Sequence, residues 1–114
     1  MLNQLSLAQL VDLLRRQEVS SREITQACLD QVERVEPLIH AFISLNATDA
    51  LEQAAQADAL RARGVTQAEK PLLGVPIGLK DIIAVQGHPL TCGSRMLANY
   101  VSPYDAAVAE KLRA

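Results

Sequence analysis

The residue of this sequence best placed for chemistry is Lys80, which lies in a short and nearly uncharged segment, residues 74–81 (GVPIGLKD). An uncharged run precedes the lysine, and a second apolar run, residues 82–85, follows Asp81. We therefore expect Lys80 to be at least partly buried in the folded protein. Burial disfavours the ammonium form of a lysine, and a neutral amine can accept a proton. The sequence thus indicates Lys80 as a candidate general base.

Several more ordinary interpretations stand beside this one. Lys80 on its own is also typical of a structural lysine at a strand end, with its amine in water. Asp81 is an alternative ion-pair partner for it, although adjacent residues of a strand point to opposite faces. Cys92 lies in a Gly-containing segment where a thiol can be a nucleophile, but no adjacent base is evident, so we interpret it as an inert small residue. We expect His88, which stands between a glycine and a proline, to be an exposed turn residue.

Length and composition narrow the class of protein. The chain has 114 residues, 49% of them hydrophobic, which suits one domain or a part of one. Its net charge of −2 gives no electrostatic reason to expect direct nucleic-acid binding by this segment. No apolar run approaches the roughly 20 residues of a membrane-spanning helix, and the N-terminus lacks the features of a secretory signal. We therefore expect a cytoplasmic protein without membrane contact.

The cysteines and histidines predict neither a disulfide nor a metal site. Cys28 and Cys92 lie far apart in a chain without an export signal, so we expect two reduced thiols. His40 and His88 belong to no recognised ligand spacing. The sequence therefore indicates no cofactor or metal in this chain.

Two helices are predicted in the first forty residues. The first is capped by Ser6 and has apolar side chains at helical spacing over residues 7–14. The second begins with a capping box at residues 20–23 and carries an apolar stripe over residues 24–35. We expect Pro37 to end it.

A third, alanine-rich helix is predicted over residues 47–63, capped by Asn46 or Thr48 and closed by Gly64. Its small apolar side chains suit close packing against another element. The expected buried face consists of Leu51, Ala54 or Ala55, Ala59 and Ala62.

Short strands are predicted between the helices, at residues 41–45, 75–77 and 82–85, with a turn at residues 86–89. A fourth helix, capped by Ser102 or Asp105, is expected to carry Ala107, Val108 and Leu112 on one face. This order of elements indicates an α/β fold. The sequence contains only about three predicted strands, fewer than the four to six of a typical sheet. We expect the sequence to be the N-terminal part of a larger domain.

Three segments together carry a resemblance to a known family: residues 74–81, residues 91–97 (TCGSRML) and residues 104–108 (YDAAV). They resemble the amidase signature family, and within it most closely the A-type subunits of bacterial glutamyl-tRNA amidotransferases. The resemblance covers essentially the whole chain. It implies an α/β fold with a mixed β-sheet covered by helices. Residues 1–114 would be the N-terminal portion of a single amidase domain, truncated before the serine-containing signature region.

The resemblance also implies a reaction, in which Lys80 is the lysine of a Ser–cis-Ser–Lys triad. Neutral Lys80 would take a proton from the bridging serine, which takes one from the nucleophilic serine. That serine would attack the side-chain amide of glutamine and release ammonia for tRNA-dependent amidation, after which water clears the acyl-enzyme. The implied partners are amidotransferase subunits of the B and C type. ATP and Mg²⁺ are expected on one of these partners, and no cofactor on this chain.

Two departures from the family pattern matter. Ile82 stands where relatives usually carry a polar Asn, so the local hydrogen bonding differs. The two triad serines are absent, and neither Ser94 nor Ser102 matches their positions. Because a triad works as a unit, we expect the isolated chain to be inactive. The sequence leaves open a free-standing amidase for small amides, and a non-catalytic binding module derived from an amidase front end.

Overall fold

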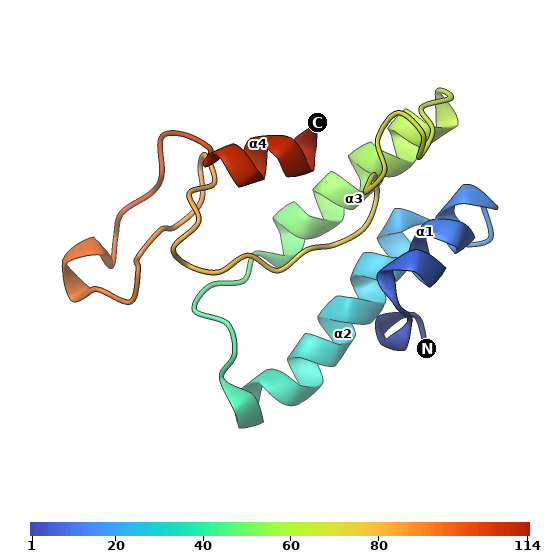
Figure 1. Ribbon diagram of the computed structural model, residues 1–114. Helices are drawn as coiled ribbons and strands as arrows, with labels where there is room; N and C mark the ends of the chain where they lie inside the picture. The colour runs from blue at the N-terminus through green and yellow to red at the C-terminus, as the bar shows by residue number, and fades with distance from the viewer. The chain divides into compact units, whose positions relative to one another are not determined.

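The computed structural model describes all 114 residues, and the chain divides into two compact units, Met1–Pro76 and Ile77–Ala114. Both units consist of helices, turns and extended segments. The first unit contains the short 3-10 helix η1 (Leu2–Gln4) and the helices α1 (Leu7–Arg15), α2 (Ser21–Ile39) and α3 (Ala47–Ala62) (Figure 1). The second contains the 3-10 helix η2 (Arg95–Leu97) and the helix α4 (Ala107–Arg113). None of these helices combines the length and the hydrophobicity needed to cross a bilayer.

The starts of the first three α-helices confirm the predicted caps. At α1 the Ser6 Oγ accepts from the Gln9 amide at 3.3 Å. At α2 the Ser20 Oγ accepts from the Glu23 amide at 3.1 Å, and the Glu23 carboxylate accepts from the Ser20 amide at 2.8 Å. These bonds satisfy amides that have no partner within the helix. The bond from the Ser20 amide, and after it one from the Ser20 hydroxyl, lowers the pKa of Glu23. At α3 the Asn46 side-chain oxygen accepts from the Asp49 amide at 3.1 Å.

The prediction that Pro37 ends the second helix is wrong. Helix α2 continues through Pro37 to Ile39 and ends at His40, whose φ of 48° places it in the left-handed region. A proline removes its own amide from the helical ladder and crowds the carbonyl four residues earlier, but residues beyond it can still bond. The His40 amide does so, donating to the Glu36 carbonyl at 2.9 Å.

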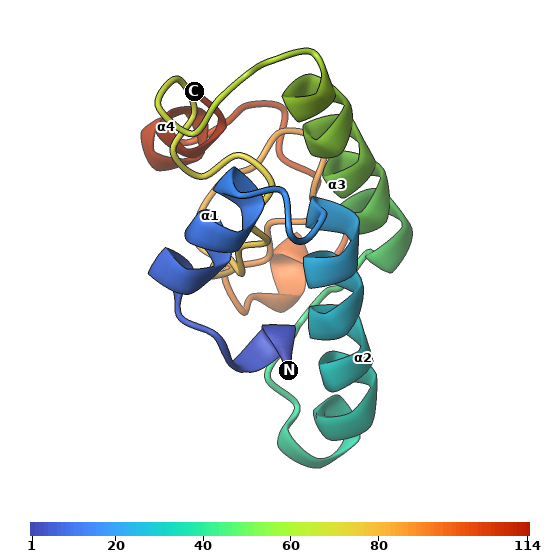
Figure 2. The ribbon, with the colours of Figure 1, turned by 90° about the vertical axis from the view of Figure 1, so that its right-hand side faces the viewer.

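The core of the first unit is small and lies between α1 and α2. Leu10, Leu14 and Ile24 are buried at its centre. Partly buried apolar side chains pack around these three, namely Leu2, Leu5, Val19 and Val75. Helices α2 and α3 lie side by side and run in opposite directions (Figures 1 and 2).

The buried face of α3 differs in part from the predicted one. Ala54 is buried as expected, but Ala59 and Ala62 are exposed and Ala57 is buried instead. The reason is that the packed face of α3 also includes two charged residues, Asp58 and Arg61. A search for apolar side chains at helical spacing does not select them.

Asp58 and Arg61 join α3 to the ends of α1 and α2. The Asp58 carboxylate accepts from the amides of Ser21 and Arg22, at 2.8 and 3.1 Å, at the N-terminus of α2. The Arg61 guanidinium donates to the Leu14 carbonyl near the C-terminus of α1 and pairs with Asp58 at 3.5 Å. The negative charge of Asp58 thus lies at the positive, N-terminal end of the α2 dipole, and the positive charge of Arg61 lies near the negative, C-terminal end of the α1 dipole.

None of the predicted strands at residues 41–45, 75–77 and 82–85 is present, so the expected sheet is absent from this chain. A strand requires a neighbouring strand for its backbone groups, and here local turns occupy some of those groups. The Val75 amide bonds to the Leu72 carbonyl, and the Ile83 amide bonds to the Lys80 carbonyl. The chain therefore contains the helical part of the predicted fold.

The second unit is held by backbone bonds between two extended segments. Residues 87–90 and 100–102 exchange bonds of 2.9 to 3.1 Å, with an isolated antiparallel bridge between Pro89 and Val101. The predicted turn at residues 86–89 is confirmed, although His88 within it is half-buried rather than exposed. The buried residues of this unit are Ala84, Leu90, Ser102 and Ala109.

The predicted caps of the fourth helix are wrong. Helix α4 begins after Ala106, which provides no side-chain bond. The two candidate caps serve the preceding loop instead, because their oxygens have nearer partners there. The Ser102 hydroxyl donates to the Tyr104 carbonyl at 2.7 Å, and the Asp105 carboxylate accepts from the Gln86 amide at 2.7 Å.

Candidate functional site

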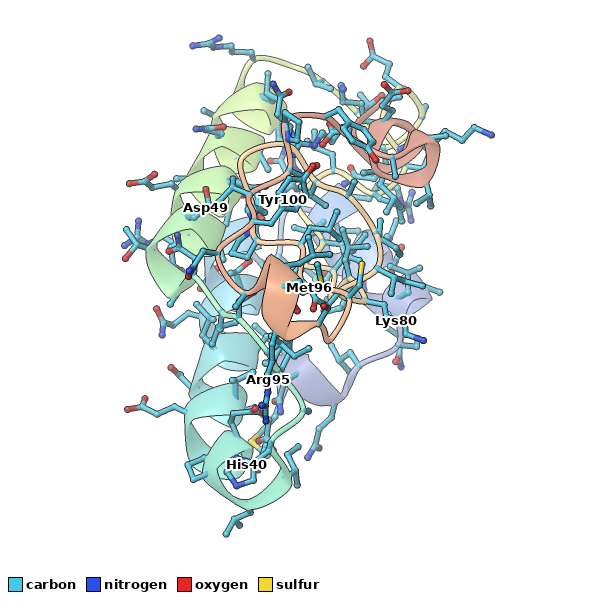
Figure 3. All side chains as sticks on the ribbon, turned by 90° about the vertical axis from the view of Figure 1, so that its left-hand side faces the viewer. His40, Asp49, Lys80, Arg95, Met96 and Tyr100 are labelled. Carbon is cyan, nitrogen blue, oxygen red and sulfur yellow. The ribbon has the colours of Figure 1, made fainter.

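The candidate base Lys80 is exposed (Figure 3). The expectation that it is buried is therefore wrong for this chain. Its apolar neighbours Ile77, Leu79 and Ile82 are themselves 48%, 41% and 60% exposed. An apolar run marks a segment suited to burial, but burial also requires another element packed over it.

The residue after the lysine is held much more firmly. The Asp81 carboxylate accepts from the Thr91 amide at 2.9 Å and also from the Thr91 hydroxyl. The Asp81 carbonyl accepts from the Cys92 amide at 3.0 Å. The segment of residues 74–81 is thus tied to the segment of residues 91–97 through a single residue.

These bonds set the ionisation of Asp81. The Thr91 hydroxyl, and after it the Thr91 amide, hold the pKa of Asp81 below its ordinary value, because both stabilise the carboxylate. The donors to this carboxylate come from Thr91, not from the amine of Lys80. The geometry therefore favours a role for Asp81 in tying two loops together over the alternative in which it pairs with the lysine.

Residues 91–94 form a tight turn that presents these donors. The Ser94 amide bonds to the Thr91 carbonyl at 2.8 Å, and Cys92 and Gly93 have φ values of 51° and 69°. Two successive positive φ angles are the mark of a type I′ turn, and they are unusual for a cysteine. The Cys92 thiol is free and exposed, and Cys28 is a half-buried thiol whose pKa is raised by burial.

The start of the motif is held inside the first unit by α2. The Ser21 hydroxyl, which is buried, donates to the Gly74 carbonyl at 2.7 Å. Gly74 has a φ of 89°, and a Cβ added there would lie 3.1 Å from the Ser21 Cβ. Val75 packs against the core of the same unit. The glycine is therefore required both by its backbone angle and by the closeness of Ser21.

The sequence pattern selects Lys80 and Asp81 but not Thr91, which bonds to Asp81, nor Ser21, which bonds to Gly74 at the start of the motif. Thr91 belongs to one of the segments that carry the family resemblance, but no sequence pattern pairs its hydroxyl with Asp81. Ser21 follows the predicted cap, and no local pattern distinguishes it. Both contacts join residues far apart in sequence, ten and 53 positions respectively.

Comparison with known proteins agrees with the motifs. The sequence pattern of the family described as Amidase matches residues 23–114. The A-type subunit of the glutamyl-tRNA(Gln) amidotransferase of Roseiflexus sp. is 46% identical over 114 residues, which is 100% of this chain and 23% of that protein. The proteins of the same name from Moorella thermoacetica and Thiobacillus denitrificans are 48% and 49% identical over 92% and 96% of this chain. The chain covers 21% and 22% of those two relatives.

Proposed function

This chain belongs to the amidase family, and from that membership we propose that it is the N-terminal part of a glutamine-hydrolysing subunit. The ammonia released would serve the conversion of Glu-tRNA(Gln) to Gln-tRNA(Gln). The observation that carries the proposal is the 46% identity, along the full 114 residues, to an A-type amidotransferase subunit. The motif around Lys80 and its attachment through Asp81 to the turn at residues 91–94 support it.

In the proposed reaction Lys80 is the terminal base of a Ser–cis-Ser–Lys triad. The neutral amine takes the proton of the bridging serine, which takes the proton of the nucleophilic serine. The nucleophile attacks the glutamine side-chain amide. The proton held by Lys80 then returns through the bridging serine to the departing nitrogen, and the carbon–nitrogen bond breaks as ammonia leaves. Water then hydrolyses the acyl-serine to glutamate and restores the enzyme. Both serines are proposed to come from the part of the subunit outside these 114 residues.

The exposure of Lys80 is consistent with a site whose two serines come from another part of the subunit. A lysine that acts as a base must be shielded from water, and here the amine is open. Ile77, Leu79 and Ile82, neighbours of the lysine in the sequence, are exposed apolar side chains of the kind that another element covers. We propose that the rest of the subunit packs over these residues and completes the site. By itself the chain would then release no ammonia, because removal of the nucleophile alone lowers such activity by orders of magnitude.

The proposal extends to the assembly. Subunits of the B and C type would bind the complete A-type subunit in the cytoplasm, and one of these partners would bind ATP and Mg²⁺. The present chain would contribute no direct contact to tRNA. Its net charge of −2 supports that last point, because nucleic-acid contacts are made chiefly by basic patches.

The test uses the complete subunit that contains this sequence, produced with its partner subunits. Ammonia release is measured with glutamine and with a simple aliphatic amide, and Gln-tRNA formation is measured with Glu-tRNA(Gln). We expect hydrolysis of glutamine and formation of Gln-tRNA. Hydrolysis of the aliphatic amide alone would replace the proposal with a free-standing amidase. No hydrolysis of either amide would replace it with a non-catalytic module.

A further inference from the structure

We propose that Asp81 and Thr91 form a positioning pair that fixes the backbone of Lys80 for its part in the reaction. This inference rests on the proposed function, because it assigns a role to the pair only if Lys80 is the base. Neither residue would touch the substrate. Both would act through the lysine.

The contacts that carry the inference converge on the two residues 80 and 81. Asp81 accepts through both carboxylate oxygens from Thr91, and through its carbonyl from the Cys92 amide. The Lys80 carbonyl accepts from the Ile83 amide at 3.0 Å. The main chain from the Lys80 carbonyl through Asp81 is thus held by hydrogen bonds, while the lysine side chain is left exposed.

The turn at residues 91–94 has the shape that these contacts require. The Gly93 amide donates to the Thr91 hydroxyl oxygen at 3.2 Å, so the hydroxyl proton is directed to Asp81. Holding Cys92 at a positive φ costs about 1–3 kcal/mol, and such strain persists only where the surroundings determine it. The lowered pKa of Asp81 keeps the carboxylate ionised at neutral pH, so these are charge-assisted bonds under working conditions.

The position of a catalytic group matters because a displacement of about 1 Å can reduce a rate by about 100-fold. A lysine side chain has many rotamers, so its amine can be placed accurately only if its Cα is fixed. The pair of Asp81 and Thr91 supplies that fixed point. A loss of the Thr91 hydroxyl should therefore lower kcat while leaving glutamine binding unchanged.

The chain itself offers a matched control. Thr66 donates its amide and its hydroxyl to the carboxylate of Glu69, at 2.9 and 3.1 Å. As at Thr91, a threonine donates its amide and its hydroxyl to one carboxylate, although here both bonds go to a single oxygen three residues away. The adjacent Lys70 lies outside the motif. Thr66→Val therefore removes an equivalent hydroxyl–carboxylate bond without touching the candidate site.

The experiment measures kcat and KM for glutamine in the complete subunit with its partners. Thr91→Val should lower kcat by about tenfold or more with KM unchanged within about twofold. Thr91→Ser, which keeps the hydroxyl, should restore kcat to within about threefold of wild type. Thr66→Val should leave both constants unchanged.

A double-mutant cycle then separates positioning from simple stabilisation. If Thr91 acts through the lysine, Thr91→Val should have no further effect in a Lys80→Ala background. An equal loss in both backgrounds would overturn the inference, as would an unchanged kcat in Thr91→Val. If Thr91→Val is insoluble, Asp81→Asn replaces it in the same cycle. Full activity of Lys80→Ala alone would instead overturn the proposed function, so the two failures are distinguishable.

Discussion

At the scale of single residues, hydrogen bonds to Asp81 hold the end of the motif of residues 74–81, where the neighbouring side chains are exposed. Each of the three Asp81 oxygens accepts at least one hydrogen bond from Thr91 or Cys92. All of these donors favour the ionised carboxylate over the neutral acid. The attachment between the two loops is therefore coupled to the protonation of a single group.

This coupling predicts a pH dependence. Because the pKa of folded Asp81 is lowered, its bonds should stabilise the fold at neutral pH and down to the ordinary aspartate pKa. That stabilisation should be lost as the pH falls through the lowered value. NMR titration of the Asp81 carboxyl carbon in this chain should show a midpoint that rises in Thr91→Val. An identical midpoint in both proteins would contradict the assigned contact.

Only part of this site could be predicted from the sequence. Lys80 and Asp81 stand out because they are charges in an apolar segment. Thr91 meets Asp81 only because Cys92 adopts a left-handed conformation, which is rare for cysteine. The exposure of Lys80 could not be predicted either, because local hydrophobicity does not reveal which element covers a segment.

A second prediction at this scale concerns the two glycines of the motif. Gly74→Ala should destabilise the chain by about 1–2 kcal/mol, since alanine disfavours the left-handed φ. The crowding of the added Cβ against Ser21 acts in the same direction. Gly78→Ala is the matched control, because its Cβ would meet nothing within 4 Å and its φ is not positive. Urea denaturation followed by circular dichroism measures both, and equal stabilities of the two variants would refute the argument.

At the scale of elements, the ends of the helices determine the arrangement of the first unit. Capping boxes fix where α1 and α2 begin, and Asp58 and Arg61 of α3 bond to the facing ends of these two helices. The boxes were predictable because their residues are local in sequence. The bonds from α3 were not, because they join residues up to 47 positions apart. The predicted strands failed for a related reason, since a strand depends on a partner that local sequence does not identify.

The bonds from α3 give a prediction for stability. Asp58→Ala removes both acceptors from the N-terminus of α2 and leaves Arg61 without its carboxylate. We expect a loss of about 2 kcal/mol in the free energy of unfolding. Asp30→Ala, in an exposed position on α2, should change it by less than about 0.5 kcal/mol. Urea denaturation measures both, and a loss as small as that of Asp30→Ala would show that the junction is not stabilising.

At the scale of the whole molecule, the two units differ in what holds them together. The first buries leucine and isoleucine side chains between helices, whereas the buried apolar residues of the second are two alanines and one leucine. Both units expose large apolar side chains, among them Leu38 in the first, 81% exposed, and Met96 in the second, 95% exposed. The motif of residues 74–81 crosses the boundary between the units at Pro76.

This contrast predicts unequal protection from hydrogen exchange. Amides in α1 and in the first half of α2 should exchange at least about tenfold more slowly than those of residues 91–97. The reason is that opening the first unit exposes more apolar surface than opening the second. Hydrogen–deuterium exchange followed by NMR at neutral pH tests this on the 114-residue chain. Equal protection throughout would mean that the two units open together.

The proposed role of Lys80 as the base for amide hydrolysis is tested most directly by one set of three proteins. Glutamine hydrolysis is measured for the complete subunit with its partners, as wild type, as Lys80→Ala and as Lys111→Ala, an exposed lysine on α4. We expect Lys80→Ala to lower kcat by about 1,000-fold or more, whereas Lys111→Ala retains wild-type activity. Wild-type kcat in a correctly folded Lys80→Ala enzyme would contradict the role assigned to this lysine.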